Sequence, residues 1–410
     1  MPVPAPRTAL SRRTFLGGAA AVGGTSILLG TTVVTVTGAP AAGATALGAN
    51  VLVTLSLRGA CDGLSLVVPH TDPAYYAARP TIGVPRTALL AADDTYGLHP
   101  QLAPLLPLWQ AGRIAAIHGT GMAIPNRSHF AAMEVVENAA PGSDLRSGWL
   151  NRLIGTDALT SPLEGIAVGG SPPTSLGGTE PYLALADLDT GIAGNDPAED
   201  RSIGRVGSLS TVWATDRSPM GAAWRTTLDA DAALAPARRA ADRTSLYPAG
   251  QLGEALAMVA RTIRGRVGAQ VITVDHGGWD MHTALGTPTH GPMVTQAGQL
   301  AKAVATFFTD LGAAADTVTL VVLSEFGRRV QENASGGLDH GWGNVMWVLG
   351  AGVRGGYYGS VAPLANTLDA DVAVTLDYRS VLAEVVRRRT SASTARVFPG
   401  FVPETVGFMR

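Results

Sequence analysis

Five short apolar runs rich in β-branched residues recur along the chain, and helical patterns lie between several of them. The runs cover residues 51–57, 113–119, 269–275, 317–324 and 344–352. Runs of this length and apolarity are typical of parallel strands buried on both faces. Helical spacing appears in residues 99–112, 126–140 and 295–312. The alternation predicts an α/β fold of the doubly wound type, with a mostly parallel sheet and helices on both faces.

The stretch from about residue 155 to 250 interrupts this alternation. It begins rich in glycine and proline ("VGGSPPTSLGGTEP") and ends helical and charge-mixed ("AALAPARRAADRTSL"). We expect an insertion or cap that lies beside the sheet and shapes ligand choice. The whole of residues 47–410 is then one large α/β domain, a size that a single core of this class accommodates.

The first 46 residues have the order of an export signal. Arg12 and Arg13 precede a weakly apolar run, and small-residue cleavage sites follow at 42–44 or 44–46. The pattern predicts a twin-arginine signal peptide, recognition by the twin-arginine translocase, and a secreted or cell-envelope location. An uncleaved membrane anchor is the alternative, which the dominance of glycine and alanine disfavours. We expect no stable membrane span after cleavage, because no later run is long and apolar enough.

Charge and cysteine content restrict the partners and the chemistry. The formal net charge is −2, which gives no electrostatic basis for binding nucleic acid. Cys61 stands alone, so neither an internal disulfide nor a cluster of thiolate ligands can form. A metal would have to be held by imidazole and carboxylate groups.

Polar residues follow the apolar runs where a ligand site is expected. Open parallel sheets bind ligands beyond the carboxyl ends of their strands. Imidazoles and carboxylates converging there would be costly without a cation to neutralise them, and this mixture of donors suits zinc first, with manganese, iron or calcium as alternatives. The candidate metal ligands are Asp62, His129, Asp280, His282, Glu325, Asp339 and His340, and the other candidate site residues are Arg58, Arg127, Ser128 and Arg328.

Each candidate also has a structural explanation. An Asp-x-His pair such as 280–282 is commonly a turn cap, and Asp62 before a glycine fits a plain turn. Glu325 could pair with Arg328 instead of a metal. Ser128 fits the N-cap of the following helix, although free N–H groups at a helix start also suit a nucleophile or an anion. The glycines around 339–340 indicate a tightly shaped backbone rather than a solvated loop.

Taken together, the segments "RGACDGLS", "NRSHFAAME", "GGWDMHT", "SEFGRRVQEN" and "LDHGWGN", with the twin-arginine leader, resemble the DUF1501 family of exported bacterial proteins. The likeness covers about residues 50–385. Members of this family look like the alkaline phosphatase/sulfatase superfamily, in which two divalent metals lie beside a nucleophile at a helix N-terminus. The resemblance implies that Ser128 is the nucleophile, that Asp62 bridges metals, and that Asp280, His282 and His340 are ligands.

Two departures from the superfamily pattern bear on activity. Phe326 stands where a second histidine ligand is expected after Glu325, so one metal site lacks a ligand unless His129 replaces it. The Cys-x-Pro-x-Arg motif of sulfatases is absent around Cys61. The expected function is a metal-dependent hydrolase of small phosphate or sulfate esters, including glycan esters, in which Arg58, Arg127 or Arg328 hold the anionic oxygens. The alternative is a catalytically degenerate relative that binds a cell-envelope ligand or partner.

Overall fold

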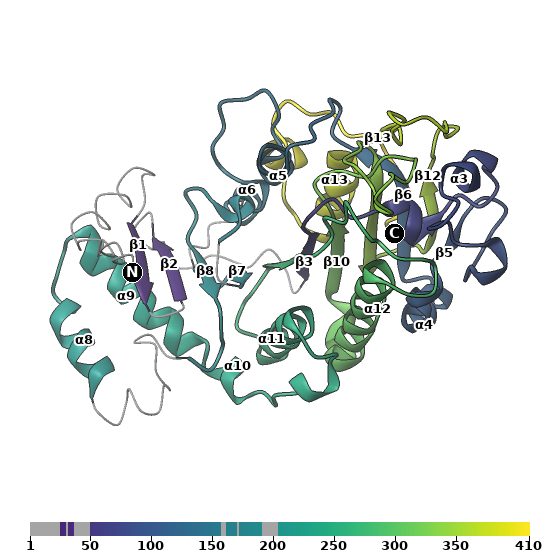
Figure 1. Ribbon diagram of the computed structural model, residues 1–410. Coiled ribbons are helices and arrows are strands. Elements are labelled where there is room, and N and C mark those ends of the chain that lie inside the picture. The colour runs from purple at the N-terminus through teal and green to yellow at the C-terminus, as the bar shows by residue number, and fades with distance from the viewer. Residues whose placement is uncertain (1–24, 30–31, 37–49, 157–160, 170–171, 191–203) are drawn as a thin grey trace, which may run out of the picture.

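The computed structural model describes residues 25–29, 32–36, 50–156, 161–169, 172–190 and 204–410. Within these ranges the chain forms one twisted central sheet with helices on both faces (Figure 1). The arginine pair and the cleavage sites of the predicted leader lie outside the described residues. No helix of the described part is long and apolar enough to cross a bilayer.

The sheet has the order β1-β2-β8-β7-β9-β3-β10-β11-β6-β12, and β13 also pairs with β6. All four strand pairs from β8 to β10 are parallel. The strands are β1 (Thr25–Leu29), β2 (Thr32–Val36), β3 (Val51–Leu57), β6 (Ile114–Gly121), β7 (Gly165–Val168), β8 (Tyr182–Leu185), β9 (Val271–His276), β10 (Val318–Leu323), β11 (Asn344–Gly350), β12 (Gly356–Gly359) and β13 (Leu376–Asp377), with β4 (Val67–Val68) and β5 (Gly97–Leu98) in a small separate sheet.

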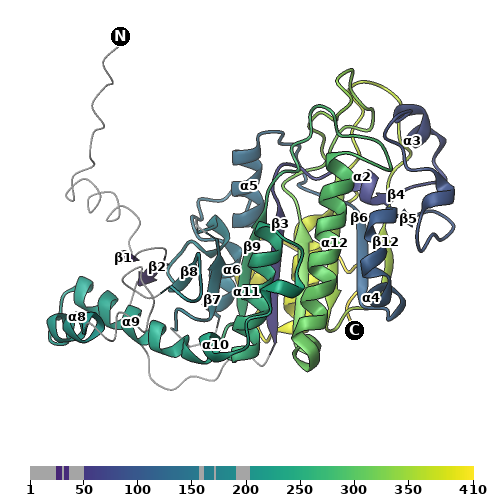
Figure 2. The ribbon, with the colours of Figure 1, turned by 60° about the horizontal axis from the view of Figure 1, so that its bottom comes forward.

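Helices cover the sheet in two layers, as the doubly wound prediction requires (Figures 1 and 2). The α-helices are α2 (Gly63–Leu66), α3 (Pro73–Ala78), α4 (Leu106–Gln110), α5 (His129–Asn138), α6 (Trp149–Ile154), α8 (Arg205–Trp213), α9 (Pro219–Ala233), α10 (Ala235–Arg239), α11 (Gln251–Gly265), α12 (Pro292–Leu311), α13 (Tyr378–Arg389) and α14 (Thr394–Val397). The short 3-10 helices are η2 (Arg86–Ala88), η3 (Pro100–Leu105), η4 (Thr174–Leu176), η5 (Thr244–Leu246) and η6 (Gly312–Asp316).

Alternate residues of the central strands enter two different cores. Val53 and Leu55 of β3 pack in the core that contains the apolar faces of α11 and α12. Leu52 of β3 joins the core on the other face, with α5, α6 and α13. Because side chains alternate across a strand, an apolar residue at every position means burial on both faces. The apolar runs therefore predict the α/β sandwich correctly.

The structure corrects three details of the predicted elements. β11 is antiparallel to both of its neighbours, β10 and β6, and is not a parallel strand. The helix expected over 99–112 is split into η3 and α4, because Pro104 lies inside the first piece and Pro107 lies in the first turn of the second. The region 155–250 does not lie wholly beside the sheet. Its strands β7 and β8 are part of the sheet, and its described helices α8 to α10 extend outward (Figure 2).

Part of the predicted leader also pairs with the sheet. β1 and β2 form an antiparallel pair, and β2 pairs with β8 at the edge of the sheet. Cleavage after residue 44 or 46 would remove both strands and leave β8 as the sheet edge. The strands that carry the candidate site, β3, β9 and β10, lie further inside the sheet.

Candidate metal centre

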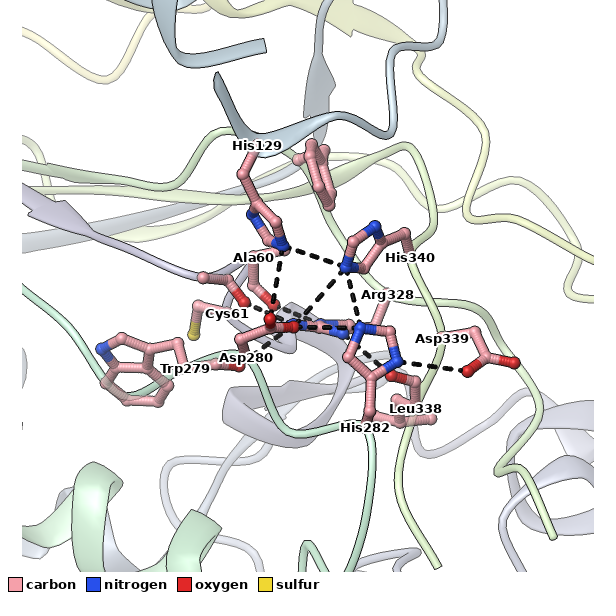
Figure 3. Close-up of polar contacts among 12 residues, drawn as sticks. Ala60, Cys61, His129, Trp279, Asp280, His282, Arg328, Leu338, Asp339 and His340 are labelled. Atoms are coloured by element: carbon pink, nitrogen blue, oxygen red, sulfur yellow. Dashed lines mark hydrogen bonds and ion pairs between the residues drawn. The ribbon is translucent and has the colours of Figure 1, made fainter. Parts of the chain in front are cut away.

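Four of the predicted ligands meet beyond the carboxyl ends of the central strands (Figure 3). His129 begins α5, Asp280 and His282 follow β9, and His340 lies in the loop between β10 and β11. One donor atom each from His129, Asp280 and His340 lies within 4.8 Å of the other two. His282 lies beside this group, with its Nε2 atom 2.9 Å from Nε2 of His340 and 3.1 Å from Oδ1 of Asp280.

The backbone is shaped to allow this convergence. Gly59 has a φ of +111°, and a Cβ there would lie 2.5 Å from the backbone nitrogen of Asp280. A Cβ on Gly337 would lie 2.2 Å from the carbonyl carbon of His282. Only glycine tolerates these approaches, so the loops after β3 and β10 can lie directly against the loop after β9. This agrees with the tightly shaped backbone expected near residue 340.

The outer nitrogens of the three imidazoles are all directed to acceptors. Nδ1 of His340 lies 2.8 Å from the carbonyl oxygen of Arg127, which can only accept, so this nitrogen carries the proton. Nδ1 of His129 lies 2.7 Å from Oε1 of Glu325, and Nδ1 of His282 lies 3.3 Å from Oδ1 of Asp339. Because carbonyl and carboxylate oxygens accept, Nδ1 is the donating nitrogen of each ring, and the Nε2 atoms of His129 and His282 both face Nε2 of His340.

Three converging lone pairs and a carboxylate repel one another unless a cation lies among them. Nε2 of His340 is 3.0 Å from Nε2 of His129, and Asp280 oxygens lie 3.5 Å from Nε2 of both His129 and His340. A tetrahedral zinc ion with bonds of about 2.0–2.1 Å would place its ligand atoms about 3.3 Å apart. The donor set and its spacing therefore fit zinc or a similar transition metal, whereas calcium prefers oxygen ligands only.

Arg328 holds the Asp280 carboxylate in place. Its guanidinium is 1% exposed and donates to Oδ1 of Asp280 at 2.6 Å. It also donates to the carbonyl oxygens of Ala60 at 2.6 Å and Leu338 at 2.9 Å. Burial disfavours the Asp280 carboxylate, but the hydrogen bond and charge of Arg328 outweigh this and lower the pKa of Asp280. Arg328 is thus a structural clamp and not a free group for substrate oxygens.

Glu325 and Asp339 lie one shell further out than the sequence predicts. Glu325 is buried and accepts from His129 Nδ1 and, at 2.9 Å, from the backbone N–H of Gly59. Asp339 accepts from the Asn333 side chain at 3.0 Å, and this hydrogen bond, against slight burial, lowers the pKa of Asp339. Outer carboxylates of this kind orient metal-binding imidazoles and raise their basicity. The ring of His129, the residue expected to replace the missing histidine, lies against Phe326 with centroids 5.0 Å apart.

Asp62 is held apart from this group in a closed ion pair. Arg79 donates to both of its oxygens, at 2.6 and 3.0 Å, and Ser65 also donates to it. Both charged side chains are almost fully buried, at 0% and 4% exposure. Burial disfavours the carboxylate, but the charge of Arg79 prevails and lowers the pKa of Asp62. The structure therefore gives Asp62 a role in holding the loop after β3, where the sequence predicts a metal ligand.

The remaining candidates lie around the centre. Ser128 is exposed at the N-cap position of α5, and its side chain makes no capping hydrogen bond. Arg127 is 39% exposed and pairs with Asp371. Arg58 pairs with Glu137 at 2.5 Å and with Asp275 at 2.9 Å. Sequence reasoning did not assign roles to Asn333, or to Arg79 and Asp371, whose partners Asp62 and Arg127 lie 17 and 244 positions away in the chain.

The family profile described as "Protein of unknown function (DUF1501)" matches residues 49–385. The chain belongs to the DUF1501 family. This confirms the resemblance inferred from the ordered motifs. No curated protein matches the chain.

Two solved structures are similar to this DUF1501 protein at low identity. The zinc complex of the C-terminal periplasmic domain of EcEptC from Escherichia coli is 11% identical, with a TM-score of 0.32 and 76% of each chain covered. The crystal structure of Ps i-CgsB is 10% identical, with a TM-score of 0.33, covering 86% of this chain and 74% of that one.

Proposed function

We propose that this DUF1501 protein is an exported metal-dependent hydrolase that cleaves a phosphate or sulfate ester. The observation that carries the proposal is the convergence of donor atoms from His129, Asp280 and His340 at the edge of the sheet, with Nε2 of His282 2.9 Å from Nε2 of His340. These side chains are 22–47% exposed, so a substrate oxygen can approach the centre. A bound zinc ion would supply Lewis acidity to that oxygen. Export by the twin-arginine route is part of the same proposal.

Ser128 is the proposed attacking group. It is exposed and directly precedes the ligand His129. The first N–H groups of α5 have no intrahelical acceptor, so they and the helix dipole favour an anionic group at this position. The Ser128 hydroxyl would form a bond to phosphorus or sulfur as the bond to the leaving oxygen breaks, and water would then release the ester from serine.

Arg127 is the proposed partner of the anionic oxygens. Of the three candidate arginines it is the most exposed, at 39%, against 19% for Arg58 and 1% for Arg328. Arg58 has two carboxylate partners, and Arg328 is buried beneath Asp280. A guanidinium at the rim offers paired N–H donors that match the geometry of phosphate or sulfate.

The test is turnover of a panel of phosphate and sulfate esters by the zinc-loaded protein. Ser128→Ala should abolish turnover and leave the zinc content unchanged. Ser335→Ala changes another exposed serine, in the loop before Asp339, and should leave both unchanged. Full activity of Ser128→Ala would show that this serine is not the nucleophile.

A binding protein without turnover is the second candidate. Four protein ligands around one position resemble a closed structural zinc site, whereas catalytic sites keep one position open. Phe326 also occupies the place of an expected ligand. This candidate predicts stoichiometric zinc, no turnover of any ester, and a cell-envelope ligand or partner that binds equally well to Ser128→Ala.

A further inference from the structure

Three large, exposed apolar side chains lie on two segments beside the metal centre, residues 124–130 and 368–371. Phe130 is 91% exposed, Leu368 81% and Ile124 79%. The large apolar side chains exposed in the described part of the chain are these three with Leu145, Val212, Leu246 and Val402. Large exposed apolar groups beside a polar site mark places where a ligand or partner removes them from water.

An ion pair joins these two segments. Arg127, between Ile124 and Phe130, pairs with Asp371, and Leu368 lies on the turn just before Asp371. The carbonyl oxygen of Arg127 accepts from Nδ1 of His340 at 2.8 Å, so this junction directly contacts a proposed metal ligand. Each of the three apolar residues is therefore three positions in sequence from Arg127 or Asp371, the ion pair that borders the centre.

The junction carries an excess of positive charge. Arg329 also pairs with Asp371, at 3.3 Å, so two guanidinium groups share one carboxylate. Asp371 is 15% exposed and Arg127 is 39% exposed, which leaves part of the Arg127 guanidinium open to an anion. The rim of the centre thus offers a cation and apolar surface together.

We infer that the ligand of this centre is an amphiphilic anionic ester, which has its phosphate or sulfate group at the metal ligands and Arg127 and its apolar group on Ile124, Phe130 and Leu368. That the ligand is an ester depends on the proposed function, whereas its amphiphilic character is inferred from Arg127 and the exposed apolar side chains near it. A purely polar ester, such as a phosphorylated sugar, would leave these side chains in water. The shared chemistry is found both in soluble esters with an apolar tail and in anionic lipids.

The test uses probes that cannot be hydrolysed. Binding of octylphosphonate and ethylphosphonate to the full-length, zinc-loaded protein is measured by calorimetry. Each methylene moved from water to an apolar surface strengthens binding by up to about fourfold. With partial coverage of the tail, we expect octylphosphonate to bind at least about tenfold more tightly than ethylphosphonate.

Phe130→Ser should reduce this preference to less than about threefold and leave the zinc content unchanged. Val402→Ser is the matched control, because Val402 is 87% exposed and lies near the end of the chain, away from both loops in sequence. It should retain the full preference. Equal affinities of the two phosphonates, or equal effects of the two substitutions, would overturn the inference.

The outcomes separate this inference from the proposed function. Ester turnover with no preference for the longer tail would support the hydrolase and refute the amphiphilic ligand. A strong preference with no turnover would support the ligand class and refute the hydrolase. Given that preference, sedimentation with phosphatidic acid vesicles, but not with phosphatidylcholine vesicles, would identify an anionic lipid as the source, and its absence would identify a soluble ester.

Discussion

Asp62 and Asp280 each follow a strand of the central sheet, and each has an arginine partner, yet they have opposite environments. Arg79 donates to both oxygens of Asp62, and the pair is almost fully buried. Arg328 donates to Oδ1 of Asp280, while Oδ2 lies near His129 and the side chain is 47% exposed. A strand-end carboxylate is thus available to a metal only where its arginine leaves an oxygen free.

The largest expected effect is on the free energy of unfolding, at the closed ion pair of Asp62 and Arg79. Asp62→Asn leaves the buried Arg79 guanidinium without a counter-charge, so the free energy of unfolding should fall by about 3–5 kcal/mol. Urea unfolding of the metal-free protein measures this. Asp280→Asn should cost less, about 1–3 kcal/mol, because Asp280 is 47% exposed and the buried Arg328 keeps its carbonyl acceptors. A loss of zinc without a loss of stability in Asp62→Asn would instead make Asp62 a ligand.

At the metal centre, substitution of a ligand should reduce the amount of bound zinc. His282→Ala and His340→Ala each remove an Nε2 donor, so zinc affinity should fall by more than the about 10–100-fold typical of an outer-shell change. Elemental analysis of the purified variants measures the bound zinc. His290→Ala is the control, because this histidine is exposed and pairs with Thr287 outside the centre. Full zinc content in both ligand variants would disprove the centre.

A smaller effect on zinc affinity is expected from Glu325, which contacts the proposed ligand His129. Glu325→Gln keeps the shape of the side chain but weakens the hydrogen bond that orients His129, so zinc affinity should fall by about 10–100-fold. Competition with a chromogenic chelator measures the dissociation constant. Complete loss of zinc would show that Glu325 is itself a ligand, as the sequence predicts.

The last effect is confined to acid pH and concerns an imidazole outside the metal centre. His118 lies within β6 and is buried, with Nε2 2.8 Å from the carbonyl oxygen of Val67. Burial lowers the pKa of His118 to about 4. Between pH 6.5 and 4 the unfolded chain binds a proton that the folded chain does not, so stability falls as the pH falls.

This histidine should contribute up to about 1.4 kcal/mol per pH unit within that window. His118→Asn should therefore flatten the acid limb of a stability profile measured by urea unfolding. His290→Asn, an exposed control, should leave the slope unchanged. Burial also lowers the pKa of His99 to about 4, so part of the slope should remain in His118→Asn.

The fold was largely predictable because strand burial is written in consecutive residues. The run 51–57 has the same bounds as β3, and the other four runs agree with their strands within two residues at each end. Strand direction was not predictable for β11, since an apolar run indicates burial on two faces and carries no sign of which way the chain crosses the sheet.

The centre was predictable only in part. His282 and His340 have carboxylates within two positions, which suggested chemistry from local spacing. Asp62 shows the limit of such reasoning, because its partner Arg79 lies 17 residues away and no spacing rule links the two. The assignment of Glu325 to an outer shell depends on where α5 places His129, 196 residues earlier in the chain.

The five hydrogen bonds of Arg328 also bear on the order in which the molecule assembles. They join this residue to Gly59 and Ala60, 269 and 268 positions away, and to the segment at 279–280. Such distant pairings form slowly, because long loops must close first. The three segments meet only when β3, β9 and β10 are already aligned. A metal bound at the proposed centre would therefore join a nearly finished protein, in contrast to small zinc domains whose folding the metal itself drives.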